Sequence, residues 1–183
     1  MTTLALARPS RRVTAAGIVG FAAAIALAAQ VAVPIPGTPV PVTLQPMLVM
    51  LAGLWLGPVA GAASMALYLA AGALGLPVFT PFGAPGMARL VGPTGGYLLA
   101  YPVAAYVTGW LAKRGTGSLG RALLAALAGM ATLYAGGVAQ LVVISGSLAR
   151  AAVLGLLPFV ALDLVKAGVA AMLAPRREDR ARG

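Results

Sequence analysis

The sequence predicts an all-α integral membrane protein, and three observations support this fold class. The chain is 61% hydrophobic and only 9% charged, whereas soluble domains contain about 25% charged residues. Its apolar runs are continuous and rich in Ala and Leu, while a membrane β-barrel would need alternating apolar and polar residues. No polar linker separates one group of runs from another. We therefore expect one helical domain, residues 1–183, in a lipid bilayer.

The apolar runs predict six membrane helices with approximate bounds. The second and third should separate at Gly57-Pro58, because proline has no N–H and interrupts a helix interior. Arg11 and Arg12 resemble the start of a signal peptide, but the apolar stretch Val13–Val33 is longer than the core of such a peptide, so we expect a retained helix. The ranges are about residues 13–33, 45–56, 59–76, 95–112, 119–144 and 151–174.

The basic residues predict the orientation of the helices. They flank the apolar runs, which indicates orientation in the membrane rather than binding of nucleic acid. With the N-terminus inside, Arg89 and Arg150 fall in outside connections and Lys166 falls within the membrane. Both termini are therefore expected to be cytoplasmic. The inside residues are Arg8, Arg11, Arg12, Lys113, Arg114, Arg121, Arg176, Arg177, Arg180 and Arg182.

Two connections between helices are unusual, because both are rich in proline and poor in charge. Residues 34–43 read PIPGTPVPVT, and residues 77–94 read PVFTPFGAPGMARLVGPT. Proline restricts the unfolded backbone and so lowers the entropy that is lost when a segment becomes ordered. We expect these segments, called the first cap (34–43) and the second cap (77–94), to be structured and to cover the outward end of the helices.

One charged pair is the main candidate for a functional site. Asp163 and Lys166 stand within an apolar run, and residues three apart on a helix share nearly one face. Charges at membrane depth cost several kcal/mol unless they are paired or solvated. The pair therefore indicates a polar ligand held inside the protein. Packing without a ligand is the alternative.

Further polar residues near the outward end, all of them neutral except Arg89, strengthen this hypothesis. Together with the pair they offer hydrogen-bond donors, acceptors and a second cation, which is typical of a site for a small polar molecule with an apolar body. Tyrosine at a membrane interface and Thr or Gln between helices also have ordinary structural roles. The residues are Thr43, Gln45, Arg89, Thr94, Tyr97 and Gln140, with Thr38, Tyr68, Tyr101 and Tyr134 nearby.

Several kinds of chemistry are not indicated. The sequence has no Cys and no His, which removes disulfides, thiol catalysis and the common transition-metal sites. It also lacks the GxxxxGK[ST] motif of P-loop ATPases. Ser145 and Ser147 have no histidine to activate them, and Asp163 has no second carboxylate beside it. We expect no enzyme activity, no cofactor and no metal.

The first helix carries small residues at every fourth position. Such a stripe lets another helix approach closely. It is either a packing surface inside the molecule or a docking face for a partner membrane protein. The residues are Ala16, Gly20, Ala24 and Ala28, followed by Ala32.

Four segments, taken together and in order, resemble the BioY family of biotin-specific substrate-binding (S) components of energy-coupling factor (ECF) transporters. They are VPIPGTPVPVTLQ at 33–45, LAGLWLGPVAGAASMALYLAAGALGLPVF at 51–79, LVGPTGGYLLAYP at 90–102 and the D-x-x-K of Asp163 and Lys166. The similarity covers nearly the whole chain. It differs at Ala161-Leu162, where many relatives have Pro-Gly.

The resemblance implies a six-helix S-component fold and capture of biotin at the outer face of a bacterial cytoplasmic (inner) membrane. It also implies delivery inward with a membrane T component and two ATP-binding-cassette ATPases. The small-residue stripe is similar in kind to the alanine-based docking surface of the family. A homo-oligomer is a further arrangement that the sequence leaves open.

Biotin has a ureido ring with N–H donors and a carbonyl, an apolar thioether ring and a carboxylate. If the resemblance holds, Asp163 would accept a ureido N–H, helped by Gln45 or Gln140. Tyr97, Thr43 and Thr94 would be donors. Lys166 would pair with Asp163 or meet the carboxylate, for which Arg89 is the other candidate.

Other functions remain open from the sequence. One is an S component for a different vitamin, which would bind thiamin or riboflavin. Another is a channel or carrier for small solutes that works alone. A third is an assembly protein without a ligand, in which the charged pair serves packing.

Overall fold

The computed structural model describes residues 11–113 and 118–175, and helices dominate these residues. Within them no β-strand forms, apart from an isolated antiparallel bridge between Val33 and Val42. Of the basic residues that predict orientation, Arg8, Arg114, Arg176, Arg177, Arg180 and Arg182 lie outside the described residues. The helices are α1 (Arg11–Gln30), α2 (Gln45–Leu56), α3 (Pro58–Ala73), α4 (Met87–Val91), α5 (Gly95–Lys113), α6 (Leu119–Ser145), α7 (Leu148–Gly155) and α8 (Val160–Met172).

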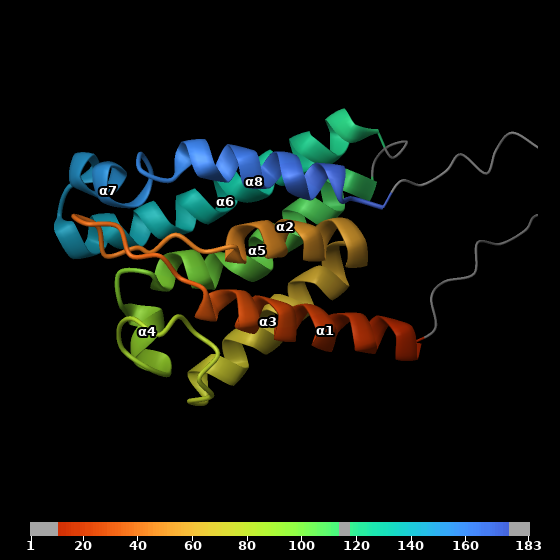
Figure 1. The fold of residues 1–183 in the computed structure, drawn as a ribbon, viewed down its shortest axis with the longest axis horizontal. Coiled ribbons are helices and arrows are strands. Elements are labelled where there is room, and N and C mark those ends of the chain that lie inside the picture. The colour runs from red at the N-terminus through yellow and green to blue at the C-terminus, as the bar shows by residue number, and fades with distance from the viewer. Residues whose placement is uncertain (1–10, 114–117, 176–183) are drawn as a thin grey trace, which may run out of the picture.

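The long helices run side by side as a bundle, and the two caps gather at one end of it (Figure 1). Helix α5 is central, since it contacts α2, α3, α4 and α6, while α8 contacts α2 and α6 and α1 contacts α2 and α3. The first cap, α4 and α7 lie at the left end in Figure 1, opposite the turn between α2 and α3. We call this left end the capped end.

Glycines allow the central helices to approach one another closely. A Cβ added at Gly53 of α2 would clash with the Ala105 carbonyl of α5, and one at Gly96 of α5 would clash with the Gly136 carbonyl of α6. These contacts are therefore between backbones, as is common where small residues line helix interfaces in membranes. The close packing fixes how α2 and α6 are rotated about α5, and hence which side chains face the capped end.

The exterior is apolar, in keeping with a membrane protein. Val59, Leu74 and Val143 are 73%, 86% and 85% exposed. Helices α1 and α6 are each long and apolar enough to cross a membrane, as are α7 and α8 together if that bent pair is one span. Helices α2 and α3 are apolar but shorter, with 12 and 16 residues. The crossing of the membrane by six helices and the cytoplasmic termini stay predictions.

Two predicted helices end earlier than expected, for local reasons. Helix α1 ends at Gln30 rather than near Val33, because the residue before a proline avoids helical backbone angles and Val33 pairs with Val42 instead. Helix α3 ends at Ala73 rather than near residue 76. Gly75 follows in the left-handed region at φ +96° and its N–H donates to the Gly72 carbonyl, a typical helix C-terminus.

The prediction of one continuous sixth helix over 151–174 is wrong. The segment forms α7 and α8, which meet at an angle of 56°. Pro158 lies in the break, where it has no N–H to donate and its ring opposes a regular helix. The short α4 within the second cap was also not expected, since it is only 5 residues long.

Candidate functional site

A cavity lies at the capped end, where the caps meet the bundle. The empty space inside it and at its open mouth, solvent included, amounts to about 690 Å³. Seven of the eight predicted ligand-site residues line it, namely Asp163, Lys166, Tyr97, Thr43, Gln45, Arg89 and Thr94. The other lining residues are Val40, Pro41, Val42, Pro46, Tyr68, Phe79, Thr80, Leu98, Tyr101, Met130, Leu133, Tyr134, Gly155 and Phe159.

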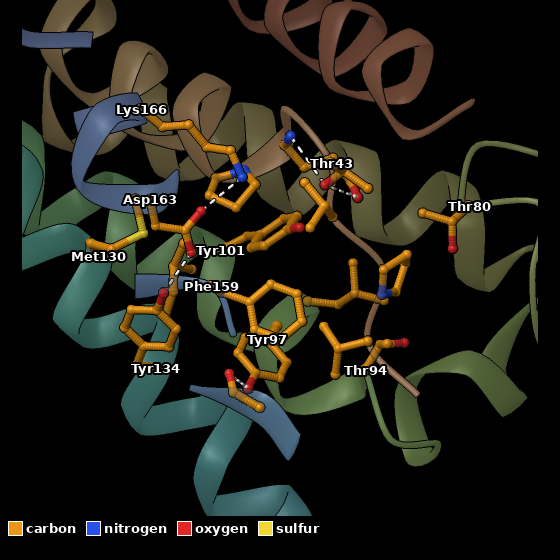
Figure 2. Close-up of a pocket in the computed structure, with 18 of the residues that line it drawn as sticks. Thr43, Thr80, Thr94, Tyr97, Tyr101, Met130, Tyr134, Phe159, Asp163 and Lys166 are labelled. Atoms are coloured by element: carbon orange, nitrogen blue, oxygen red, sulfur yellow. Dashed lines mark hydrogen bonds and ion pairs between the residues drawn. The ribbon is translucent and has the colours of Figure 1, made fainter. Parts of the chain in front are cut away.

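The charged pair forms the polar wall of the cavity (Figure 2). Lys166 Nζ lies 2.7 Å from Asp163 Oδ1, and the Tyr134 hydroxyl donates to Asp163 Oδ2 over 2.6 Å. Asp163 and Lys166 are only 5% and 9% exposed. The pair is therefore neutral overall and satisfied on both carboxylate oxygens. Asp163 also lies in the first turn of α8, where the helix dipole favours a negative charge.

This arrangement leaves hydrogen-bonding capacity on both charged groups. A carboxylate offers several lone pairs, and each Asp163 oxygen accepts one bond here. An ammonium has three N–H donors, and the bond to Asp163 uses one of those on Lys166. The pair can thus accept an N–H from a ligand and donate to a ligand without being broken.

A neutral network forms another part of the lining. Gln45 Nε2 donates to the Tyr68 hydroxyl over 2.8 Å, and the Thr43 hydroxyl donates to Gln45 Oε1 over 3.2 Å. The Tyr68 ring meets Phe79 edge-on and stacks with Tyr101, with centroids 5.4 and 6.3 Å apart. This network combines polar atoms with flat apolar faces, as a ligand with a polar ring and an apolar body needs.

Arg89 lines the cavity, but most of its donors are occupied by the second cap. Its Nε donates to the Ala84 carbonyl over 2.9 Å, and its terminal nitrogens donate to Thr80 Oγ1, the Thr80 carbonyl and the Phe82 carbonyl. Burial lowers the pKa of the guanidinium, and the nearby Tyr68 hydroxyl acts in the opposite direction. Arginine stays charged in proteins, so Arg89 is a buried cation that folds the cap around itself.

Tyr97 connects the wall of the cavity to the break between α7 and α8. Its hydroxyl donates to the Gly155 carbonyl over 2.5 Å. Its ring occupies the space beside Gly137 of α6, where an added Cβ would overlap it. In the view of Figure 2, Tyr97 and Phe159 lie between the ion pair and Thr94.

Gln140 does not line this cavity, although it was predicted to be in the site. Its amide nitrogen donates to the Leu90 carbonyl over 3.1 Å and to the Gly92 carbonyl over 2.6 Å. These carbonyls belong to the second cap, at the end of α4. Gln140 therefore attaches the cap to α6, and a direct contact with the ligand has no support in this geometry.

Sequence reasoning assigned no role to several lining residues. Tyr134 was noted only as a nearby polar residue, yet it is the second partner of Asp163. The two stand 29 positions apart, and no local pattern connects them. The apolar wall of Phe79, Met130 and Phe159 also gave no signal, because apolar residues are common throughout the chain.

The small-residue stripe of α1 lies mostly off the face that α1 buries. Ala16 and Gly20 are exposed, and an added Cβ at Gly20 would meet nothing within 4 Å. The buried residues of α1 are Ala22, Ile25 and Ala29. Packing within the chain therefore does not account for the first half of the stripe. Docking of a partner there stays a prediction.

Comparisons with known proteins agree with the family resemblance of the sequence. The model of the family described as BioY matches residues 2–182. The chain is 42% identical to the probable biotin transporter BioY of Pyrococcus horikoshii, over 85% of this chain and 90% of that protein. It is 40% identical to the biotin transporter BioY of Thermotoga maritima, over 91% and 95%. The crystal structure of the S-component for biotin from an ECF-type ABC transporter superposes with a TM-score of 0.83 and 28% identity, covering 93% of each chain.

Proposed function

The chain belongs to the BioY family, and from that premise we propose that it binds biotin in the cavity at the capped end and serves its uptake. The observation that carries the proposal is the mutually hydrogen-bonded group of Asp163, Lys166 and Tyr134 in that cavity, whose charges compensate each other. It retains both acceptor and donor capacity at a depth where charges are costly. A pair kept only for packing would not need to face a cavity.

The ureido ring of biotin is proposed to bind at Asp163, with the Gln45 and Thr43 network near it. An N–H of the ring would donate to a free lone pair of the carboxylate, and the ring carbonyl would accept from a neutral donor. The thioether ring would pack on the aromatic faces of Tyr101 and Phe159. These contacts use the polar and apolar parts of the wall for the matching parts of one molecule.

Lys166 is the better candidate for the biotin carboxylate, and Arg89 is the weaker one. The Lys166 ammonium uses one of its N–H donors for Asp163, and the others can bind a ligand. By contrast, Nε and both terminal nitrogens of Arg89 already donate to the second cap. Recruiting Arg89 would leave cap carbonyls without donors, which costs free energy in a buried site. Arg89 would instead attract the anion through its charge.

Transport is proposed to depend on partners, a T component and two ATPases, in the cytoplasmic membrane of a bacterium. The sequence has no P-loop of its own. The exposed part of the small-residue stripe, with Ala16 and Gly20, is a suitable surface for a partner helix. Six membrane crossings with both termini inside fit the charge distribution of the sequence and complete this proposal.

The first experiment is titration calorimetry of biotin with the purified chain, beside Asp163→Asn and the double variant Asp163→Asn with Lys166→Met. We expect stoichiometric binding by the wild type. Asp163→Asn should weaken binding at least about a hundredfold and destabilise the fold, because removing one partner of a buried pair costs about 3–5 kcal/mol.

The double variant is the matched control, since it removes both charges. It should recover stability but not biotin binding. Unchanged affinity in Asp163→Asn would remove the central role of the carboxylate. No binding by a well-folded wild type would remove the assignment of biotin and call for thiamin and riboflavin. Uptake by vesicles that contain this chain alone would favour a stand-alone carrier.

A further inference from the structure

The break between α7 and α8 leaves main-chain carbonyls without their helical donors. In a continuous helix the N–H of residue 158 would donate to the Leu154 carbonyl, but Pro158 has no N–H. The Phe159 N–H donates to the Leu156 carbonyl instead of to Gly155. The Leu157 N–H donates to the Ala152 carbonyl rather than to Val153. The last three carbonyls of α7 therefore lack their helical donors, and an unpaired carbonyl away from water is costly.

Side chains from two different parts of the capped end supply donors to two of these carbonyls. The Tyr97 hydroxyl of α5 donates to the Gly155 carbonyl. The Thr38 hydroxyl of the first cap donates to the Leu154 carbonyl over 2.5 Å. Thr38 and Leu154 are 116 positions apart. This bond therefore joins the first cap to α7, which is distant in sequence but lies at the same end of the bundle.

Thr38 also determines the backbone of the first cap beside the cavity. The Val40 N–H donates to Thr38 Oγ1 over 3.1 Å, so the hydroxyl accepts from one residue and donates to another. Hydrogen bonds in such a chain strengthen each other. Val40 itself and the next two residues, Pro41 and Val42, line the cavity. The position of this part of the cavity wall is thus tied to the Leu154 carbonyl.

We propose that Thr38 is a positioning residue that fastens the first cap over the cavity, and that Pro158 provides its anchor by leaving the Leu154 carbonyl free. The inference rests on the proposed function, because the retention of biotin is its main readout. In this proposal biotin leaves past the first cap, so opening of the fastening is a step in its dissociation. Weakening the bond therefore raises the dissociation rate without removing any group that touches the ligand.

The test measures biotin dissociation from preloaded protein after a chase with excess unlabelled biotin. Thr38→Val keeps the shape of the side chain and removes the hydroxyl. We expect dissociation about five- to tenfold faster, which corresponds to one neutral hydrogen bond, with unchanged binding stoichiometry. Thr38→Ser keeps the hydroxyl and should stay within about twofold of the wild type.

Thr132→Val is the matched control, because the Thr132 hydroxyl also donates to a backbone carbonyl, that of Ala128 over 2.9 Å, but does not line this cavity. It should not change dissociation. If Thr38→Val releases biotin at the rate of the wild type, the fastening role is wrong. If it only lowers the fraction of active protein, with the same rate in the remainder, Thr38 has a purely structural role and the proposal also fails.

Pro158→Ala tests the anchor from the other side. Alanine restores an N–H and removes the ring that opposes a helix. If residues 155–158 then become helical, this N–H donates to the Leu154 carbonyl and replaces the Thr38 bond. We expect faster dissociation, and adding Thr38→Val should change the rate by less than about twofold. A full additional effect of Thr38→Val in this background would show that the two residues act independently and would overturn the inference.

A readout without biotin separates this inference from the proposed function. The chain has no cysteine, so Met130→Cys, at a lining position that is 5% exposed, is a unique thiol inside the cavity. Thr38→Val and Pro158→Ala should each raise its rate of modification by a charged maleimide, and Thr132→Val should not. Equal rates would overturn the fastening role, even if biotin is not the ligand.

Discussion

The two caps cover the same cavity but are attached to the molecule in different ways. The second cap is folded around a buried cation and tied to both α6 and α1, while the first cap is closed on itself by a short bridge and reaches α7 through one neutral hydroxyl. The bonds of the second cap come from Arg89, Gln140 and Gln30. Those of the first cap are the Val33–Val42 bridge, the Thr38–Leu154 bond and, where the cap joins α2, the bonds between Thr43 and Gln45.

This difference shows which part of the cavity wall is fixed and which part can open. Bonds from a charged, planar donor are stronger than neutral ones and fix more than one acceptor at a time. Losing one bond of the second cap leaves the others in place. Losing the Thr38 bond releases the tip of the first cap. We therefore interpret the second cap as a rigid wall and the first cap as the gate.

The largest effect is expected for Arg89→Met, which removes the centre of the second cap. Several buried carbonyls would lose their donor at once, so the free energy of unfolding should fall by at least about 3 kcal/mol and biotin binding should be lost. Thermal unfolding in detergent and calorimetry measure both. Arg150→Met is the control, because Arg150 is exposed. If Arg89→Met is as stable as the wild type, Arg89 does not hold the second cap together and the difference between the two caps is wrong.

A medium effect is expected for Gln140→Leu. The Leu90 and Gly92 carbonyls would lose their donor, which costs about 1–2 kcal/mol for bonds of this kind. Hydrogen exchange should become faster in α4 and remain unchanged in the first cap. Thr132→Val on the same helix should leave exchange in both caps as it is. Equal acceleration in the two caps would mean that they open as one unit.

The smallest effect is expected for Gly37→Ala in the first cap. Gly37 has φ +85°, in the left-handed region of backbone angles. A residue with a Cβ costs about 1 kcal/mol or slightly more there than glycine does. Nothing lies within 4 Å of the added Cβ, so only backbone strain opposes closure. Biotin affinity should fall about fivefold with little change in melting temperature. Gly120→Ala, also without neighbours but at the start of a helix, should leave affinity unchanged. A large drop in melting temperature for Gly37→Ala would show that the first cap supports the fold.

Composition and local spacing determined a large part of this protein. Continuous apolar runs specify helices because lipid offers no partner for free backbone groups. Asp163 and Lys166 form the predicted pair because the helical repeat brings residues three apart onto one face, whatever the rest of the chain does. Prolines marked the two caps, and Pro158 could have marked the break in the sixth helix, but the surrounding apolar run suggested a continuous span.

Only the tertiary structure decided which distant side chains meet. Tyr134 reaches Asp163, Thr38 reaches Leu154, and Gln140 faces the second cap instead of the cavity. Each of these depends on how one helix is rotated and shifted against another, and here glycine contacts between α2, α5 and α6 set that rotation. A helix repeat fixes neighbours along one helix, but it carries no information about the angle at which that helix docks on the next one.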